Sequence, residues 1–113
     1  MEIFERELGT EHQHTATAYN DLSLLLSSLM QYSEAIETLE KSLKIYQRIY
    51  GEKHPETAAV YHNLGKSLYH KEDFTRSLDC FQKSLAIKKT VLGSDHPMTK
   101  HTQEFINVVK KRV

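Results

Sequence analysis

Residues 51–58 read Gly-Glu-Lys-His-Pro-Glu-Thr-Ala, and this stretch decides the fold because the chain carries it three times. The upstream copy, Gly-Thr-Glu-His-Gln-His-Thr-Ala, occupies residues 9–16, and the downstream copy, Gly-Ser-Asp-His-Pro-Met-Thr-Lys, occupies residues 93–100. Each outer copy lies 42 residues from the central one. A constant period of this size is typical of a repeat array.

Each copy is expected to end one helix and to begin the next. Glycine takes the left-handed backbone conformation that closes a helix without strain. Proline suits the first position of the following helix, where its missing N–H is not needed. We therefore predict helix breaks at Gly9, Gly51 and Gly93, and positive φ angles at Gly51 and Gly93.

The composition indicates one ordinary globular domain, because 39% of the 113 residues are apolar and 27% are charged. The 15 basic and 15 acidic residues cancel, which disfavours nucleic acid as the main partner. Cys80 is the single cysteine, so no internal disulfide forms and a reducing, cytoplasmic location is expected. No apolar run approaches the ~20 residues of a membrane helix. Few glycines and prolines remain outside the joints, so a nearly all-helical chain is expected.

The 42-residue period divides the chain into four parts. Residues 1–8 align with 43–50 and 85–92, and we expect them to be the end of a helix from a preceding repeat; a short native N-terminal helix is the alternative. Residues 9–50 and 51–92 are two full repeats, the first with helices at about 14–30 and 33–49. Residues 93–113 are expected to form a capping helix, because Gln103, Asn107 and Lys110 place polar residues at positions that are expected to be buried in the earlier repeats.

Apolar residues recur at helical spacing in both helices of each repeat. The second helix of the first repeat also has a polar side, with Glu34, Glu37, Lys41, Lys44 and Arg48. Leu39 and its equivalent Phe81 are expected in the centre of the core. Small residues fall where two helices approach closely, namely at Ser23, Gly65, Ala35 and Ser77. The apolar stripe of the first helix consists of Tyr19, Leu22, Leu25, Leu26 and Leu29.

This pattern resembles the tetratricopeptide repeat, a helix–turn–helix unit with large and small apolar residues at set places. Tyr61, Leu64 and Gly65 match its first helix, and Phe74, Ser77, Phe81 match its second. The 42-residue period, the Gly-x-x-His-Pro joint and the stretch Tyr-His-Asn-Leu at 61–64 are similar to the kinesin light chain subclass, also seen in nephrocystin-like proteins. The resemblance implies an all-α solenoid of antiparallel helix pairs, a fragment of a right-handed superhelix.

No residue pattern predicts catalysis, a metal site or a cofactor. His12, His54 and His96 lie one per repeat, whereas zinc ligands must all approach one ion to ~2.0–2.1 Å. We expect these histidines to cap and pack the joints. The serines lie inside predicted helices, without the strained turn of a catalytic serine. Cys80 is expected to be half-buried and unreactive.

Protein binding is the remaining hypothesis for the function, because the first helices of a solenoid line its concave side and form an extended binding surface. We predict a groove that binds an extended peptide of a partner protein, formed by Asn20, Asp21, His62, Asn63, Lys66, Tyr69, Glu104 and Phe105. The resemblance implies that Asn63 bonds the peptide backbone; the first repeat has Asp21 at that position. Tyr69 and Phe105 are expected to be exposed, which favours binding. Two alternatives stay open: a merely solvated face, and self-association through the uncovered apolar edge of the first repeat.

Overall fold

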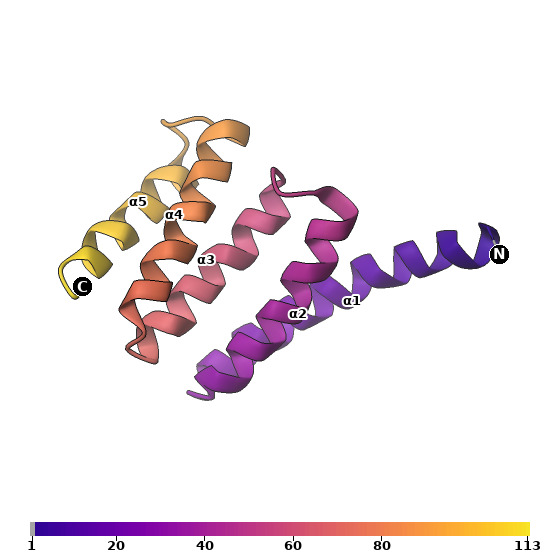
Figure 1. The fold of residues 1–113 in the computed structure, drawn as a ribbon, viewed down its shortest axis with the longest axis horizontal. Helices are drawn as coiled ribbons and strands as arrows, with labels where there is room; N and C mark the ends of the chain where they lie inside the picture. Colours follow the sequence, from indigo (N-terminus) through magenta and orange to yellow (C-terminus); the bar gives the residue numbers. More distant parts are fainter. Residues whose placement is uncertain (1) are drawn as a thin grey trace.

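The chain is built from helices alone over the part that the computed structural model describes, which is the backbone of residues 2–113 and the side chains of residues 13–113. The helices, in order, are α1 (Glu2–Ser28), α2 (Tyr32–Tyr50), α3 (Pro55–His70), α4 (Phe74–Val91) and α5 (Pro97–Lys110). Figure 1 shows consecutive helices packed side by side, α1 with α2, α3 with α4, and α5 against α4. Short connections make neighbours antiparallel, which confirms the predicted all-α repeat architecture.

The two helix–helix connections that begin at Gly51 and Gly93 have the predicted backbone conformation. Gly51 has a φ of 83° and Gly93 a φ of 93°, so both take the conformation that an L side chain disfavours. The Gly51 N–H donates to the carbonyl of Gln47 at 2.9 Å and closes α2. The Gly93 N–H is shared between the carbonyls of Lys88 at 3.1 Å and Lys89 at 3.2 Å, and it closes α4.

The histidines of these joints begin the next helices, as expected. Pro55 and Pro97 start α3 and α5, and the residue before each is the N-cap. The Nδ1 of His54 accepts from the backbone N–H of Glu56, and that of His96 accepts from Met98, both at 3.1 Å. Each imidazole thereby satisfies one of the N–H groups that a helix start leaves unpaired.

The predicted break at Gly9 is wrong, because α1 runs without interruption from Glu2 to Ser28. The upstream copy of the joint has Gln13 where the later copies have proline, and glutamine keeps the N–H that a helix interior needs. A glycine inside a helix costs only about 1 kcal/mol relative to alanine. Residues 2–8 therefore belong to the same helix as the first helix of repeat 1, whereas residue 1 lies outside the described residues and the division into repeats stays a prediction.

The core consists of two apolar clusters, and Leu39 and Phe81 lie in them as predicted, 1% and 0% exposed. The first cluster joins α1, α2 and α3 and includes Leu39, Tyr46, Leu64 and Leu68. The second joins α4 to α5 around Phe81, Leu85, Ile106 and Val109. The polar residues expected on the capping helix also fit, because Asn107 and Lys110 are exposed.

Small residues let the helices approach closely at the predicted positions. A Cβ on Gly65 would come within 2.8 Å of the Phe81 ring, so only glycine fits there without a shift. The buried Ser77 Oγ donates to the Gly65 carbonyl at 2.6 Å. Ser42 and Ser84 also use their hydroxyls: they donate to the carbonyls of Ala16 and Ala58, both at 2.8 Å. These bonds tie the second helix of each pair to the first.

The first-repeat edge of α1 is uncovered in the described structure. Leu22, Leu25 and Leu29 are 43%, 56% and 58% exposed. The residues equivalent to Leu22 are Leu64 and Ile106, which are buried against the preceding second helix. None of the described helices is both long and apolar enough to cross a membrane.

Candidate functional site

The first helices carry three hollows, which we name by position. The α1–α3 pocket, of about 320 Å³, is lined by Ser23, Leu24, Ser27, Ser28, Tyr32, Asn63, Lys66, Ser67 and His70. The α3–α5 pocket, of about 440 Å³, is lined by Ala59, His62, Asn63, Lys88, Pro97, Met98 and His101. The terminal pocket, of about 170 Å³, is lined by Lys66, Tyr69, His70, Phe105, Val108 and Val109. Asn63 lines the first two hollows and Lys66 lines the first and third, so both residues lie where hollows meet.

The structure joins the two predicted asparagines. The Asn63 Nδ2 donates to the Asn20 Oδ1 at 2.9 Å, which bridges α1 and α3. The bond uses one of the two Asn63 amide protons and leaves the Asn63 carbonyl oxygen as an acceptor. Asn63 therefore retains one donor and one acceptor, which is what an extended peptide backbone requires.

Lys66, Asp21 and Glu104 are exposed, but only Lys66 borders the hollows. No carboxylate forms an ion pair with Lys66 among the described side chains. Asp21 and Glu104 line none of the three hollows. Asn20 does not line them either, so the predicted set separates into five residues around the hollows and three outside them, namely Asn20, Asp21 and Glu104.

The expected exposure of Tyr69 and Phe105 is wrong, because both side chains are half-buried against the second core cluster. The Phe105 ring stacks on Phe81 with centroids 5.2 Å apart, and Tyr69 meets the Phe74 ring edge-on at 5.3 Å. The physical reason is that α5 is the last helix and must cover Phe81. Both residues still line the terminal pocket.

His62 lies between aromatic rings instead of standing in solvent. Its ring meets Phe81 and Phe105 edge-on, with centroids 5.3 Å and 5.1 Å away. Burial, followed by the charge of Lys88, lowers the pKa of His62 to about 3. His62 is therefore neutral at pH 7 and contributes shape and hydrogen bonding, not charge.

Sequence reasoning missed several residues that shape the hollows. Tyr32 stacks on His70 with centroids 4.7 Å apart, and Lys88 reaches the α3–α5 pocket from a second helix. The predicted groove contains residues of first helices alone, whereas Tyr32 and Lys88 belong to second helices. The sequence does contain one indication that Lys88 is unusual. Lys88 lies 42 residues after Tyr46 and is therefore its equivalent in the second repeat, at a core position where a lysine is unexpected.

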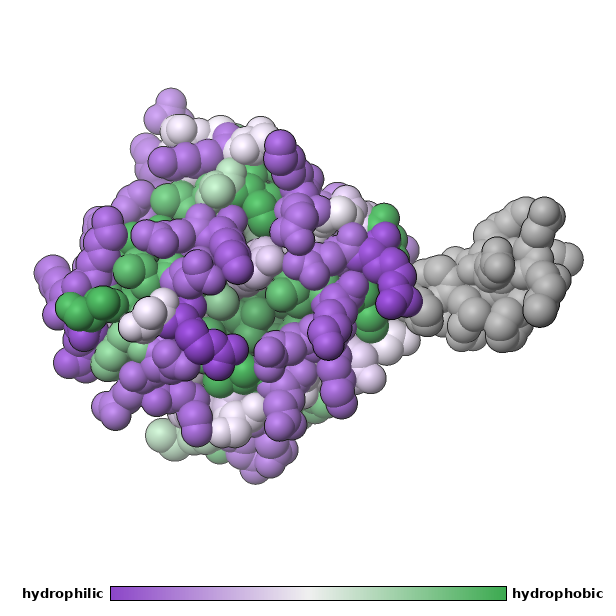
Figure 2. Space-filling model, in the orientation of Figure 1, coloured by the Kyte–Doolittle hydropathy of each residue, from purple (hydrophilic) through white to green (hydrophobic). Residues whose placement is uncertain are grey.

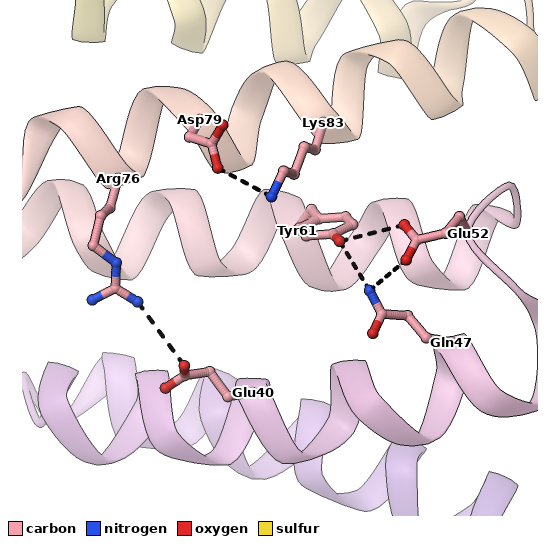
Figure 3. Close-up of polar contacts among 7 residues, drawn as sticks. All are labelled: Glu40, Gln47, Glu52, Tyr61, Arg76, Asp79 and Lys83. Atoms are coloured by element: carbon pink, nitrogen blue, oxygen red, sulfur yellow. Dashed lines mark hydrogen bonds and ion pairs between the residues drawn. The ribbon is translucent and has the colours of Figure 1, made fainter.

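The face over α2 and α4 is polar, as predicted for α2, and several of its side chains pair with each other. Figure 2 shows polar side chains over most of this face, with apolar surface between them. In Figure 3, Arg76 reaches Glu40 at 3.9 Å, and the Gln47 amide donates to the Tyr61 hydroxyl and to Glu52, each at 2.9 Å. Glu34, Glu37, Lys41, Lys44 and Arg48 are all exposed.

Cys80 is half-buried, as expected. Burial, followed by the charge of Asp79, raises the pKa of its thiol to about 11. The thiol is therefore protonated at neutral pH and is a poor nucleophile.

Comparison with known proteins agrees with the repeat architecture. The profile described as tetratricopeptide repeat matches residues 1–47, 25–90 and 56–106. Among solved structures, the crystal structure of BtubC (BKLC) from P. vanneervenii superposes with a TM-score of 0.80 at 28% identity. The match covers 86% of this chain and 39% of that one, so this chain spans well under half the length of BtubC. No curated protein matches the chain.

Proposed function

The chain belongs to the tetratricopeptide repeat family, with repeats of the kinesin light chain-like kind, and from this we propose that it binds an extended peptide segment of a partner protein in its first-helix groove. Members of this family generally mediate protein–protein interaction and are generally not enzymes. The partner that we propose is therefore a protein. The net charge of zero favours a protein partner over nucleic acid. The single cysteine, which cannot form an internal disulfide, favours a reducing compartment, and we propose the cytoplasm.

The observation that carries the proposal is the position of Asn63 and Lys66 between neighbouring hollows: Asn63 lines the α1–α3 and α3–α5 pockets, and Lys66 lines the α1–α3 and terminal pockets. A segment that crosses from α1 to α5 over α3 passes both residues. The Asn63 amide can donate to and accept from the segment's backbone, so binding does not depend on a particular side chain. Lys66 adds attraction for an acidic residue, and the partly exposed ring of Tyr69 offers flat apolar contact at low entropy cost.

Affinity is expected to be modest. The groove is short and the peptide loses conformational entropy when it becomes ordered. We expect a Kd on the order of micromolar, which corresponds to a binding free energy of about −8 kcal/mol. A random peptide display library, selected on the immobilised protein, would supply the ligand for titration.

Calorimetric titration of a selected peptide against four proteins tests the proposal. We expect Asn63→Ala to weaken binding by roughly 1–3 kcal/mol, because a desolvated peptide group loses its partner. Lys66→Ala should weaken it more at low salt than at high salt. Glu37→Ala, on the opposite face, is the control and should bind like the wild type. If Asn63→Ala binds the peptide as tightly as the wild type and Glu37→Ala loses peptide binding, the site lies on the second-helix face instead.

A second candidate function, self-association as a structural unit, is favoured by the exposed leucines of α1. The positions of Leu22 and Leu25 are filled in α5 by Ile106 and Val109, 2% and 0% exposed against the second helix before them. An amphipathic helix of a second copy would cover the same positions on α1. Such burial is worth roughly 1.5–3 kcal/mol for each leucine that becomes fully covered.

A further inference from the structure

Asn20 lies outside the three hollows but bonds to a residue that lines two of them. Asn63 lines the α1–α3 and α3–α5 pockets, whereas Asn20 lines none of the three. The Asn63 Nδ2 donates to the Asn20 Oδ1 at 2.9 Å, and this bond joins α3 to α1. Asn20 can therefore affect a segment bound in these hollows through Asn63, without touching the segment itself.

Packing between successive first helices does not require this amide pair. One repeat later, 42 residues along the chain, the position of Asn20 is occupied by His62. The position of Asn63 is occupied by Phe105. These two later side chains meet edge-on, with ring centroids 5.1 Å apart, and they join α5 to α3. Since a contact between rings suffices at the equivalent place, the hydrogen-bonded amides are suited to a role other than packing.

The bond to Asn20 fixes the orientation of the Asn63 amide. The terminal torsion of an asparagine side chain is broad and roughly two-fold, so an unbonded amide also takes the orientation in which its oxygen and nitrogen are exchanged. The oxygen and the nitrogen lie on opposite sides of the Cγ atom. Because the Asn63 nitrogen is directed to α1, its oxygen is directed away from α1. A segment that crosses α3 from α1 towards α5 (Figure 1) therefore meets the nitrogen of Asn63 first and its oxygen second.

We propose that Asn20 is a positioning residue of the first-helix groove, which holds the Asn63 amide so that its oxygen accepts a backbone N–H of the bound segment on the side away from α1. This role rests on the proposed groove, because it specifies how Asn63 recognises the segment. It also sets a sequence preference. The residue of the segment whose N–H meets Asn63 is any residue except proline, which has no N–H to donate.

The mobility of the Asn63 amide tests the proposal in the ligand-free protein. The side-chain NH2 signal of Asn63, identified by its absence from the NMR spectrum of Asn63→Ala, should show the relaxation of an ordered group in the wild type. Asn20→Ala should make this group mobile, because the acceptor is lost. Asn20→Asp should keep it ordered, because a carboxylate oxygen accepts the same bond. Asp21→Ala is the matched control, since Asp21 is exposed beside Asn20 and lines none of the hollows.

Titration of a peptide selected from the display library measures the effect on binding. Asn20→Ala should weaken binding roughly fivefold, because an N–H of Asn63 loses its partner where the segment excludes water. Asn20→Asp should bind like the wild type at high salt, where its added charge is screened. In the Asn63→Ala background, Asn20→Ala should cause no further loss, since Asn20 acts only through Asn63.

Single N-methyl groups along the same peptide test the recognised N–H. At one position of the peptide, N-methylation should weaken binding to the wild type more than binding to Asn63→Ala, because it removes the N–H that Asn63 accepts. The same methyl group should also cost less in Asn20→Ala, whose Asn63 amide is free to turn. N-methyl losses that are equal in all three proteins at every position would contradict the proposed recognition.

An Asn63 amide that is mobile in the wild type would overturn the proposal without any variant, so the test stands even where Asn20→Ala unfolds. Unchanged binding by Asn20→Ala would also overturn it. An equal loss from Asn20→Ala with and without Asn63→Ala would mean that Asn20 touches the segment directly, which excludes the positioning role. Full binding by Asn63→Ala rejects the groove and this role together, whereas weakened binding by Asn63→Ala with full binding by Asn20→Ala rejects this role alone.

Discussion

At the scale of single residues, the close contact between Gly65 and Phe81 is the tightest constraint in the second repeat. The equivalent pair in the first repeat is Ser23 and Leu39, a larger residue facing a smaller one. Gly65→Ala should destabilise the fold by about 1–3 kcal/mol, because its Cβ would meet the Phe81 ring at 2.8 Å. Adding Phe81→Leu should relieve the clash, so the double variant should lose less stability than the single losses add up to. Urea unfolding of the three variants measures this, and strictly additive losses would contradict it.

Residue identities alone predicted part of this arrangement. The alignment of the repeats predicted that Leu39 and Phe81 are central and that Gly65 allows a close approach. It could not predict that Ser42 and Ser84 donate to carbonyls of the facing helix. A position that requires a small residue accepts serine whether or not the hydroxyl finds a hydrogen-bond partner, so the sequence does not distinguish the two cases. The half-burial of Tyr69 and Phe105 was also out of reach, since it depends on how α5 covers Phe81.

At the scale of helices, the same sequence signature gives two outcomes, a break at Gly51 and an unbroken helix at Gly9. The local difference is the residue after the histidine, which is proline at position 55 and glutamine at position 13, and only proline forces a helix to begin there.

An identical substitution at the two glycines tests the difference. Gly51→Ala should destabilise the fold by roughly 1–2 kcal/mol, because φ is 83° there. Gly9→Ala should stabilise α1 by roughly 0.5–1 kcal/mol, because alanine is the better residue inside a helix. Thermal unfolding followed by circular dichroism compares them. Destabilisation by both changes would mean that Gly9 ends a helix after all.

At the scale of the whole molecule, the 42-residue period predicted the architecture, because each repeat must place its apolar stripe against its neighbour. The period predicted the candidate site only in outline. The first-helix face, Asn63 and Lys66 could be named, but the bond from Asn63 to Asn20 and the reach of Lys88 from α4 into the pocket arise from side-chain packing between repeats. Such contacts follow from the superhelical stacking, which a list of residues does not specify.

The uncovered edge of α1 leads to a prediction about assembly. If a second copy covers Leu22, Leu25 and Leu29, light scattering over a dilution series should show a dimer that dissociates on dilution. Leu25→Glu should shift this equilibrium to monomer, because a charge would be buried in the apolar contact. Leu24→Glu is the matched control: Leu24 is similarly exposed, at 46%, but lines the α1–α3 pocket. It should leave the dimer intact while altering peptide binding. A wild-type chain that stays monomeric at all concentrations, or equal effects of the two changes, would exclude this edge as a dimer contact.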